Sequence, residues 1–162
     1  MKQLKAIRPA LALLVSLGSV LPAQAVAVDV IFSGNLVVPP PCEINSDNAI
    51  SVVFGNDMLT ERVDGVNYEK TIAYTLDCNG ATSTALKLQF QGAGTVFDAS
   101  VLATSMPALG LELRSDGVKL PLNTWINFTD PTRPVLTAVP VKGNKLNGGV
   151  FTATSTLVVD YQ

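Results

Sequence analysis

The last 14 residues of the chain, 149–162, alternate between apolar and polar side chains. This period of two predicts a β-strand with one face on a core and the other in water. Because it is the last segment, we expect no later strand to cover its outer edge, which is then free to pair with another chain. Its apolar face consists of Phe151, Ala153, Leu157, Val159 and Tyr161, together with Ser155.

A second alternating stretch lies near the other end of the chain, at residues 26–38. Three consecutive prolines, residues 39–41, follow it and immediately precede Cys42. Because proline donates no backbone hydrogen bond and favours an extended chain, we expect the prolines to separate a first strand from a body that begins at Cys42. The alternative is an ordinary first strand of the domain, ended by the prolines. One face of this stretch carries Val28, Val30, Phe32, Gly34 and Leu36.

The residues after Cys42 form short strand-like runs separated by turn signals such as Asp64-Gly65 and Asp116-Gly117. No amphipathic helix longer than two turns is predicted. Many short strands with regular turns favour an all-β fold, a sandwich of immunoglobulin type. The single tryptophan, Trp125, follows both cysteines, so the order typical of antibody domains is absent. The predicted runs are 49–54, 68–78, 85–91, 109–113, 124–128 and 134–141.

Residues 1–25 have the organisation of a secretory signal peptide. A basic start precedes an apolar run of 12 residues, 10–21. The tripeptide Ala23-Gln24-Ala25 forms a small-residue cleavage signal. The apolar run is too short to span a bilayer, which takes about 20 residues; the alternative is a buried N-terminal helix. Cleavage after Ala25 would leave eight basic and 13 acidic residues, a net charge of −5. That charge disfavours nucleic acid or an anionic membrane surface as a partner.

Two cysteines, Cys42 and Cys78, remain in what would be an exported chain, and a disulfide between them is expected. A redox pair or a metal site is the weaker alternative, because there is no CxxC motif and no histidine in the whole chain. The absence of histidine also removes Ser-His and Cys-His catalysis. Most acidic residues lie in or beside predicted turns, where their side chains bond the backbone. We therefore expect no catalytic residues, no metal and no cofactor.

Taken together, these residues resemble the pilin subunits of the bacterial chaperone–usher pathway. The resemblance covers essentially the whole chain after residue 25. It rests on the cysteine pair 36 residues apart, on Gly34 within the N-terminal alternating stretch, on the penultimate Tyr161, and on Gly149, which lies fourteenth from the end. The segment DVIFSGNLVVPPPC, residues 29–42, is most similar to minor, tip-associated subunits of P-pilus-like fimbriae, such as adaptors.

The resemblance implies an incomplete immunoglobulin-like β-sandwich that lacks its last strand and is completed by donor-strand complementation. It implies a signal peptide at 1–25, a donor-strand extension at 26–41 and a pilin domain at 42–162. The donor residues would be the apolar face of residues 28–36. The acceptor groove, which also binds the chaperone, would be lined by Gly149, Phe151, Ala153, Leu157, Val159, Tyr161 and Gln162, with basic chaperone residues holding the terminal carboxylate.

The function implied is that of a structural subunit of a fimbria, which polymerises by donor-strand exchange and mediates pilus assembly and cell adhesion. Its partners would be a periplasmic pilus chaperone, an outer-membrane usher and neighbouring fimbrial subunits, with no nucleic acid and no small-molecule substrate. It would be exported through the periplasm to a fimbrium on the bacterial surface. Two alternatives are a receptor-binding fimbrial adhesin and a secreted enzyme or inhibitor on a complete sandwich. The missing histidine argues against an enzyme.

Overall fold

The computed structural model describes residues 28–36 and 42–162. The chain divides after Leu36 into two units. The predicted signal peptide and the proline run at 39–41 lie outside the described residues. Within the described ranges, none of the helical segments is long and apolar enough to cross a bilayer.

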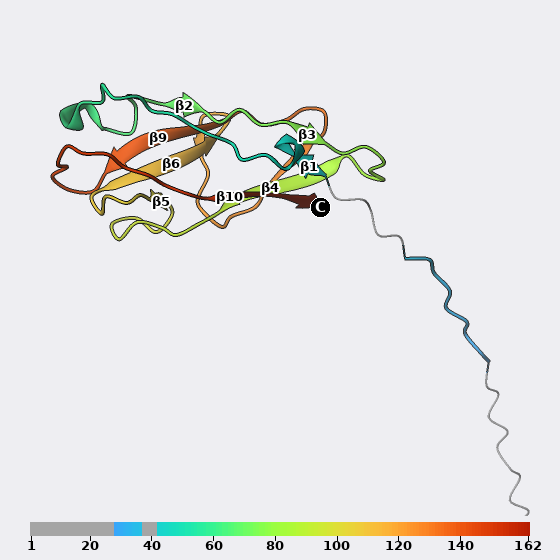
Figure 1. The fold of residues 1–162 in the computed structure, drawn as a ribbon. Coiled ribbons are helices and arrows are strands. Elements are labelled where there is room, and N and C mark those ends of the chain that lie inside the picture. Colours follow the sequence, from blue (N-terminus) through green and yellow to red (C-terminus); the bar gives the residue numbers. More distant parts are fainter. Residues whose placement is uncertain (1–27, 37–41) are drawn as a thin grey trace, which may run out of the picture. The chain divides into compact units, whose positions relative to one another are not determined.

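The body, residues 42–162, is an all-β sandwich of antiparallel strands (Figure 1). One sheet has the order β10 (Thr156–Tyr161), β4 (Ala85–Gln91), β8 (Ile126–Thr129). The other has the order β2 (Lys70–Thr71), β9 (Leu136–Lys142), β6 (Leu109–Ser115), β5 (Leu102–Ala103), with β7 (Val118–Lys119) paired to β6. A short pair joins β1 (Glu43–Ile44) to β3 (Leu76–Asp77). The 3-10 turns are η1 (Asn45–Asp47) and η2 (Thr60–Arg62).

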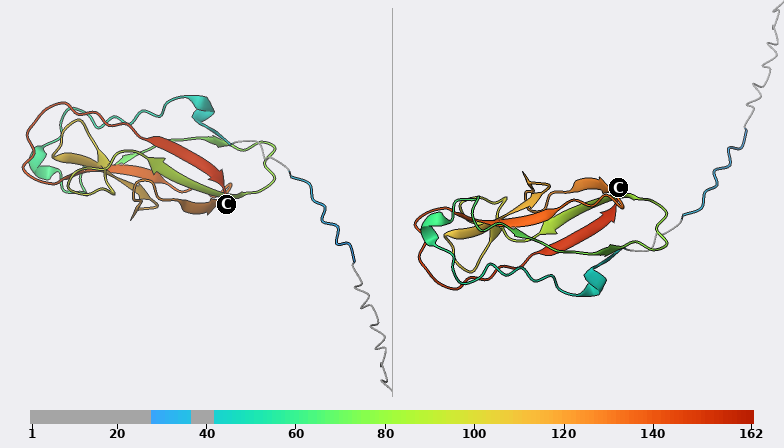
Figure 2. Two further views of the ribbon diagram at one scale, coloured as in Figure 1. Left: turned by 90° about the horizontal axis from the view of Figure 1, so that it is seen from below. Right: turned by 90° about the horizontal axis from the view of Figure 1, so that it is seen from above.

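The hydrophobic core lies between the two sheets. Figure 2 shows β4 (green) and β10 (red) of one sheet lying side by side. Alternate residues of β4 point into it, so Leu88 and Phe90 are buried while Lys87 stays partly exposed. β9, which lies inside its sheet between β2 and β6, is buried at four of its seven positions, Leu136, Ala138, Val139 and Pro140. Core residues from both sheets are Ile72, Leu88, Phe90, Leu102, Leu111, Leu113, Leu120, Leu122, Leu136 and Ala138.

Several predicted strands are confirmed, and β4 has the predicted bounds. The runs predicted at 109–113, 124–128 and 134–141 correspond to β6, β8 and β9 with shifted ends. The run predicted at 68–78 is split, because β2 pairs with β9 whereas β3 pairs with β1. A change of partner sheet along one run interrupts the ladder of hydrogen bonds that defines a strand.

Two predicted strands do not form and a third is shorter than predicted. In all three cases the residues outside a strand have no partner strand. No strand forms at 49–54 or at 28–36, and the last strand occupies only Thr156–Tyr161 instead of 149–162. β4 ends at Gln91, opposite Thr156, so the residues before Thr156 have no neighbour in that sheet. Thr152 instead bonds Ser105, accepting from its backbone N–H and donating to its Oγ. An alternating pattern predicts a strand-like face but cannot supply the strand beside it.

The predicted disulfide is confirmed, since Cys42 and Cys78 are bonded with their Cα atoms 4.3 Å apart. It closes a loop of 36 residues and joins the start of the body to the end of β3. In the chain-entropy description a loop of this size contributes about 4 kcal/mol to stability. The disulfide therefore fixes the first residue of the body against the sandwich.

Candidate functional site

Strand β10 forms one border of its sheet and pairs with β4 on one side only. The pairing is antiparallel and runs from Thr156 opposite Gln91 to Tyr161 opposite Leu86. No other strand in the described part of the chain lies along the second edge of β10. Backbone N–H and C=O groups on such an edge are available to a further strand.

A second extended segment, residues 49–58, faces the same part of the core. Its side chains alternate, with Ile50, Val52 and Phe54 partly buried against the core and Ser51 and Val53 exposed. Among the described residues, none forms a backbone hydrogen bond with residues 49–58. The alternation of a strand is therefore present, but the hydrogen bonds of a strand are not.

These two segments run in opposite directions through the body, as Figure 1 shows. At one end, Tyr161 Oη lies 3.9 Å from Cys42 Sγ. Towards the other end the rings of Phe54 and Phe151 meet, with their centroids 5.7 Å apart and their planes inclined by 50°. We call the inward-facing residues of 50–58 and 151–161 the open edge. It is an apolar strip of core that lies between residues 49–58, which have no backbone hydrogen bond to any described residue, and the edge of β10 that faces away from β4.

Most of the predicted acceptor residues lie along this open edge. Phe151, Ala153, Leu157 and Val159 are only partly buried, although all four pack against the core cluster. Every buried side-chain nitrogen or oxygen of the described residues has a hydrogen-bond partner. The unmet bonding capacity of this region is therefore that of the main chain, which another strand can satisfy.

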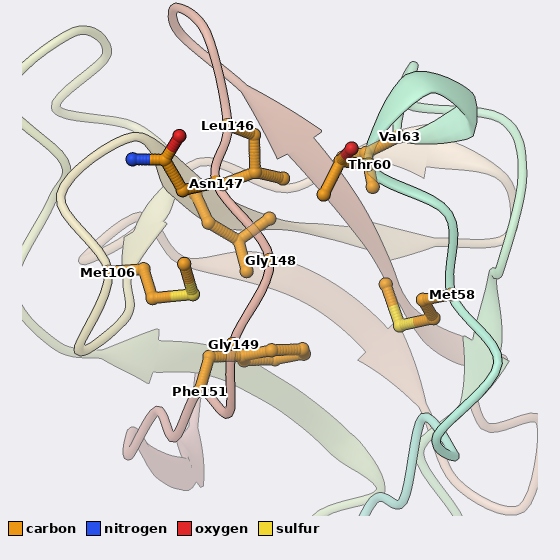
Figure 3. A pocket seen from close by; sticks show the side chains of 10 residues that line it. Met58, Thr60, Val63, Met106, Leu146, Asn147, Gly148, Gly149 and Phe151 are labelled. Atoms are coloured by element: carbon orange, nitrogen blue, oxygen red, sulfur yellow. The ribbon is translucent and has the colours of Figure 1, made fainter.

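The open edge ends in a pocket of about 60 Å³ beside Gly149 (Figure 3). Met58 and Met106 point into it from opposite sides, and the ring of Phe151 lies below them. Gly149 and Phe151 are among the predicted acceptor residues, whereas the two methionines and Leu146 are not. They are single apolar residues in non-repeating loops, so no period marks them, and only the fold brings them together. We call this cavity the end pocket.

The C-terminal residue, Gln162, lies at the opposite end of β10 and is hydrogen-bonded to β4 and β8. Its backbone N–H donates to Ala85 O at 3.2 Å, and its side-chain amide donates to Leu86 O at 2.7 Å and to Phe128 O at 3.2 Å. On the outer face beside it, Lys87 and Asp160 form an ion pair at 3.4 Å. The last residue therefore has a fixed position at this end of the sheet.

The predicted donor residues are exposed and belong to no strand. The exposed fraction is 80% for Val28, 91% for Phe32 and 99% for Leu36. Side chains of this kind gain free energy when they are buried, so their exposure in the isolated chain requires an explanation.

The site contains no group of side chains suited to metal binding or to acid–base chemistry. Among the described residues no three Cys, Asp or Glu side chains converge as metal ligands. The charged side chains that do cluster, Asp98, Glu112, Arg114 and Lys119, form ion pairs around β6 and β7. The arrangement offers main-chain hydrogen bonds and apolar pockets, which are the means by which one strand recognises another.

Comparison with known proteins assigns the family. The sequence model of the family described as "Fimbrial protein" matches residues 30–162. Two proteins of Escherichia coli (strain K12) are each 37% identical to this chain. The uncharacterised fimbrial-like protein YfcR covers 83% of this chain and 81% of its own length, and the uncharacterised fimbrial-like protein YfcQ covers 86% and 91%.

Solved structures of pilus subunits share the fold. The P pilus adaptor subunit PapF, 27% identical, matches with a TM-score of 0.56 over 77% of this chain and 98% of its own. The P pilus rod subunit PapA, 22% identical, matches with a TM-score of 0.62 over 76% and 100%.

The fold is thus that of immunoglobulin-like pilus subunits. The chain belongs to the fimbrial protein family and is a pilin of the chaperone–usher class. The proteins it resembles in that family and among solved structures are structural components of pili, and not enzymes.

Proposed function

We propose that this chain is a non-enzymatic structural subunit that polymerises by donor-strand exchange. In this proposal residues 28–36 of one subunit fill the open edge of another, and the subunit's own open edge receives the strand of a third. The observation that carries the proposal is the open edge itself, with partly buried apolar side chains between residues 49–58, which have no partner strand, and the second edge of β10. An added strand would satisfy both backbones and cover the core.

The contact between Phe54 and Phe151 supports a definite register. Their rings meet across the open edge, so little depth is left for an incoming side chain at this point. Glycine has no side chain and allows close backbone approach. Gly34, the one inward donor residue without a side chain, therefore fits over this ring pair.

The lengths of the two donor arms then support a direction. On one side of the ring pair the open edge continues over five inward positions, from Ala153 to Tyr161; on the other side lies the end pocket. The donor has three inward apolar residues before Gly34, at Val28, Val30 and Phe32, and two positions of the same parity, Leu36 and Val38, between Gly34 and the proline run. The donor residues before Gly34 therefore fit along the positions from Ala153 to Tyr161. This makes the donor antiparallel to β10 and places Leu36 in the end pocket.

Burial of the donor side chains is the main source of free energy for this contact. Burying four apolar donor side chains contributes about 6–12 kcal/mol gross. Ordering of the extension and association costs offset part of this. The main-chain hydrogen bonds add to the contact and are insensitive to sequence, so specificity would come from the pockets.

The remaining parts of the proposal concern assembly. A signal peptide at residues 1–25 would export the chain to the periplasm, where a chaperone would lend a strand to the open edge and hold the carboxylate of Gln162. An outer-membrane usher would exchange that strand for the extension of another subunit, and the product would be a fimbrium on the cell surface that serves adhesion. The 27% identity to the adaptor subunit PapF supports a minor, tip-associated position.

The test uses the chain from residue 26 onward with Val30→Asp and Phe32→Asp, which we call the donor-silenced chain. It cannot donate an apolar strand but keeps its open edge. A labelled peptide of residues 26–38 is expected to bind it with one-to-one stoichiometry and to raise its melting temperature. The matched control is the same peptide carrying the two aspartates.

Two results would contradict the proposal. One is a donor-silenced chain that binds neither peptide and unfolds at an unchanged high temperature. The other is equal binding of the wild-type peptide and the aspartate control, because burial of Val30 and Phe32 would then not drive the contact.

A further inference from the structure

A second cavity, of about 220 Å³, adjoins the end pocket. Met106 and Leu109 line both cavities, so the two are neighbours. The exposed fraction of Val96, at the rim, is 92%. We call this cavity the side cavity; it is lined by Gly94, Thr95, Val96, Ala103, Thr104, Met106, Pro107 and Leu109.

The hydroxyl groups in the wall of the side cavity are already engaged within the protein. Thr95 Oγ1 donates to Asp98 O at 2.9 Å and accepts from the Asp98 N–H at 3.0 Å. Thr104 Oγ1 lies 3.1 Å from Met106 O and 2.9 Å from Leu109 O, and it accepts from the Met106 N–H at 3.0 Å. The cavity therefore offers mainly apolar surface to a ligand and suits an occupant that needs few hydrogen bonds.

The loop that carries Val96 is fixed by further bonds. Asp98 accepts hydrogen bonds from the N–H and the Oγ of Ser100, and it pairs with Lys119 at 2.9 Å. The Thr95 N–H also donates to Val101 O at 2.9 Å. The rim is thus held in one conformation before any ligand arrives, which lowers the entropy cost of binding.

We propose that the side cavity binds the proline run, residues 39–41, of the neighbouring subunit whose extension fills the open edge. This rests on the proposed function, which places Leu36 of the donor in the end pocket. Pro40 follows Leu36 by four residues, about 12 Å of extended chain at 3.1 Å per residue. The prolines can therefore reach the side cavity past Met106, which borders both cavities.

The chemistry of the segment matches that of the cavity. Proline has no backbone N–H, and a proline run is already extended, so little freedom is lost when it docks on apolar surface. A separate role for the prolines, preventing the extension from folding back on its own groove, acts within one molecule. That role predicts no effect of the prolines on a peptide added in trans, so binding experiments separate the two.

The experiment compares three peptides on the donor-silenced chain: residues 26–38, residues 26–41, and residues 26–41 with all three prolines replaced by alanine. We expect the peptide with prolines to bind about tenfold more tightly than the other two, equivalent to about 1.4 kcal/mol. Affinities are measured by fluorescence anisotropy in competition with labelled 26–38 peptide.

A matched pair of acceptor variants locates the contact. Val96→Asp places a charge at the rim of the side cavity, whereas Val118→Asp changes a valine that is 70% exposed on β7. Val96→Asp is expected to reduce binding of the 26–41 peptide to the level of the 26–38 peptide and to leave the latter unchanged. Val118→Asp should alter neither.

Equal affinity of the proline and alanine peptides would overturn the inference, and so would an equal effect of the two acceptor variants. Failure of the 26–38 peptide to bind at all would instead overturn the proposed function. The two failures are therefore distinguishable within one set of measurements.

Discussion

At the scale of single residues, Asp98 accepts hydrogen bonds and forms an ion pair in the loop at the rim of the side cavity. Hydrogen bonds from Lys119 and then from Ser100 hold the pKa of its carboxyl far below the usual range. A carboxyl whose pKa is lower in the folded than in the unfolded chain stabilises the fold above the unfolded pKa, about 3.9. That contribution is lost as the pH falls from about 4 towards the folded pKa.

Asp98→Asn should therefore destabilise the protein at pH 7, and the difference from wild type should shrink below about pH 4. The measurement is the free energy of unfolding in urea at pH 7, 5 and 3, with the 26–38 peptide bound to the donor-silenced chain. Asp47→Asn is the control, because Asp47 is exposed and lies outside this network. A loss for Asp98→Asn that stays constant from pH 7 to pH 3 would contradict the assignment.

A second prediction at this scale concerns Gly34 and the ring pair. Valine at position 34 of the 26–38 peptide should clash with Phe54 and Phe151, and overpacking of this kind costs about 1–3 kcal/mol of binding free energy. Phe54→Ala in the acceptor should restore part of the affinity for the valine peptide while weakening the wild-type peptide. The affinities of the four combinations form a double-mutant cycle.

Ser33→Val is the matched peptide control, because residue 33 lies on the opposite face of the donor and should tolerate the change. If Gly34→Val bound as tightly as the wild-type peptide, the register that places Gly34 over the rings would be wrong.

At the scale of secondary-structure elements, the sequence predicts interior strands well and edge segments poorly. β4 agrees with its predicted bounds because every one of its residues has a partner strand, β8 along residues 85–88 and β10 along residues 86–91. Residues 49–54 have an equally good alternating pattern but no partner, and they form no strand. Pairing is a property of two segments, whereas a period is a property of one.

The candidate site likewise contains residues that the sequence predicts and residues that it does not. Its periodic members, Phe151 to Tyr161, could be predicted from the sequence. Met58 and Met106 could not be predicted, because they lie far apart in the sequence. Only the fold brings their loops together, beside Gly149 and ahead of β10. The contact between Phe54 and Phe151, which supports the register of the donor, depends on the fold in the same manner.

The unpaired segments yield a prediction for hydrogen exchange. In the donor-silenced chain alone, amides of residues 49–58 and 150–160 should exchange quickly, except for those bonded to β4 and to Ser105. Binding of the 26–38 peptide should slow exchange in both segments at once, because a strand between them bonds to each. Amides of β6 and β9, which already pair with each other, serve as the internal reference. Protection of only one segment would contradict insertion between the two.

At the scale of the whole molecule, the body has two different ends. Cys42 and the C-terminus lie at one end. The loop between β9 and β10, which contributes Gly149 to the end pocket, begins at the other end (Figures 1 and 2). In the proposed register, the extension of a donor leaves the acceptor at the end pocket, and only five residues, 37–41, then lead to the donor's Cys42. Each contact therefore joins unlike ends, and a contact of this kind generates an open filament.

This geometry can be tested with two variants that each lack one function. The donor-silenced chain keeps its open edge, and a chain with Leu157→Asp has a charge in that edge but keeps its extension. Each alone should remain monomeric in size-exclusion chromatography with light scattering, whereas the unmodified chain from residue 26 should form longer oligomers as its concentration rises. Mixed in equal amounts, the two variants should form dimers and nothing longer, because each dimer retains one silenced strand and one blocked edge. Oligomers longer than two in the mixture would mean that subunits also associate through a surface other than the open edge.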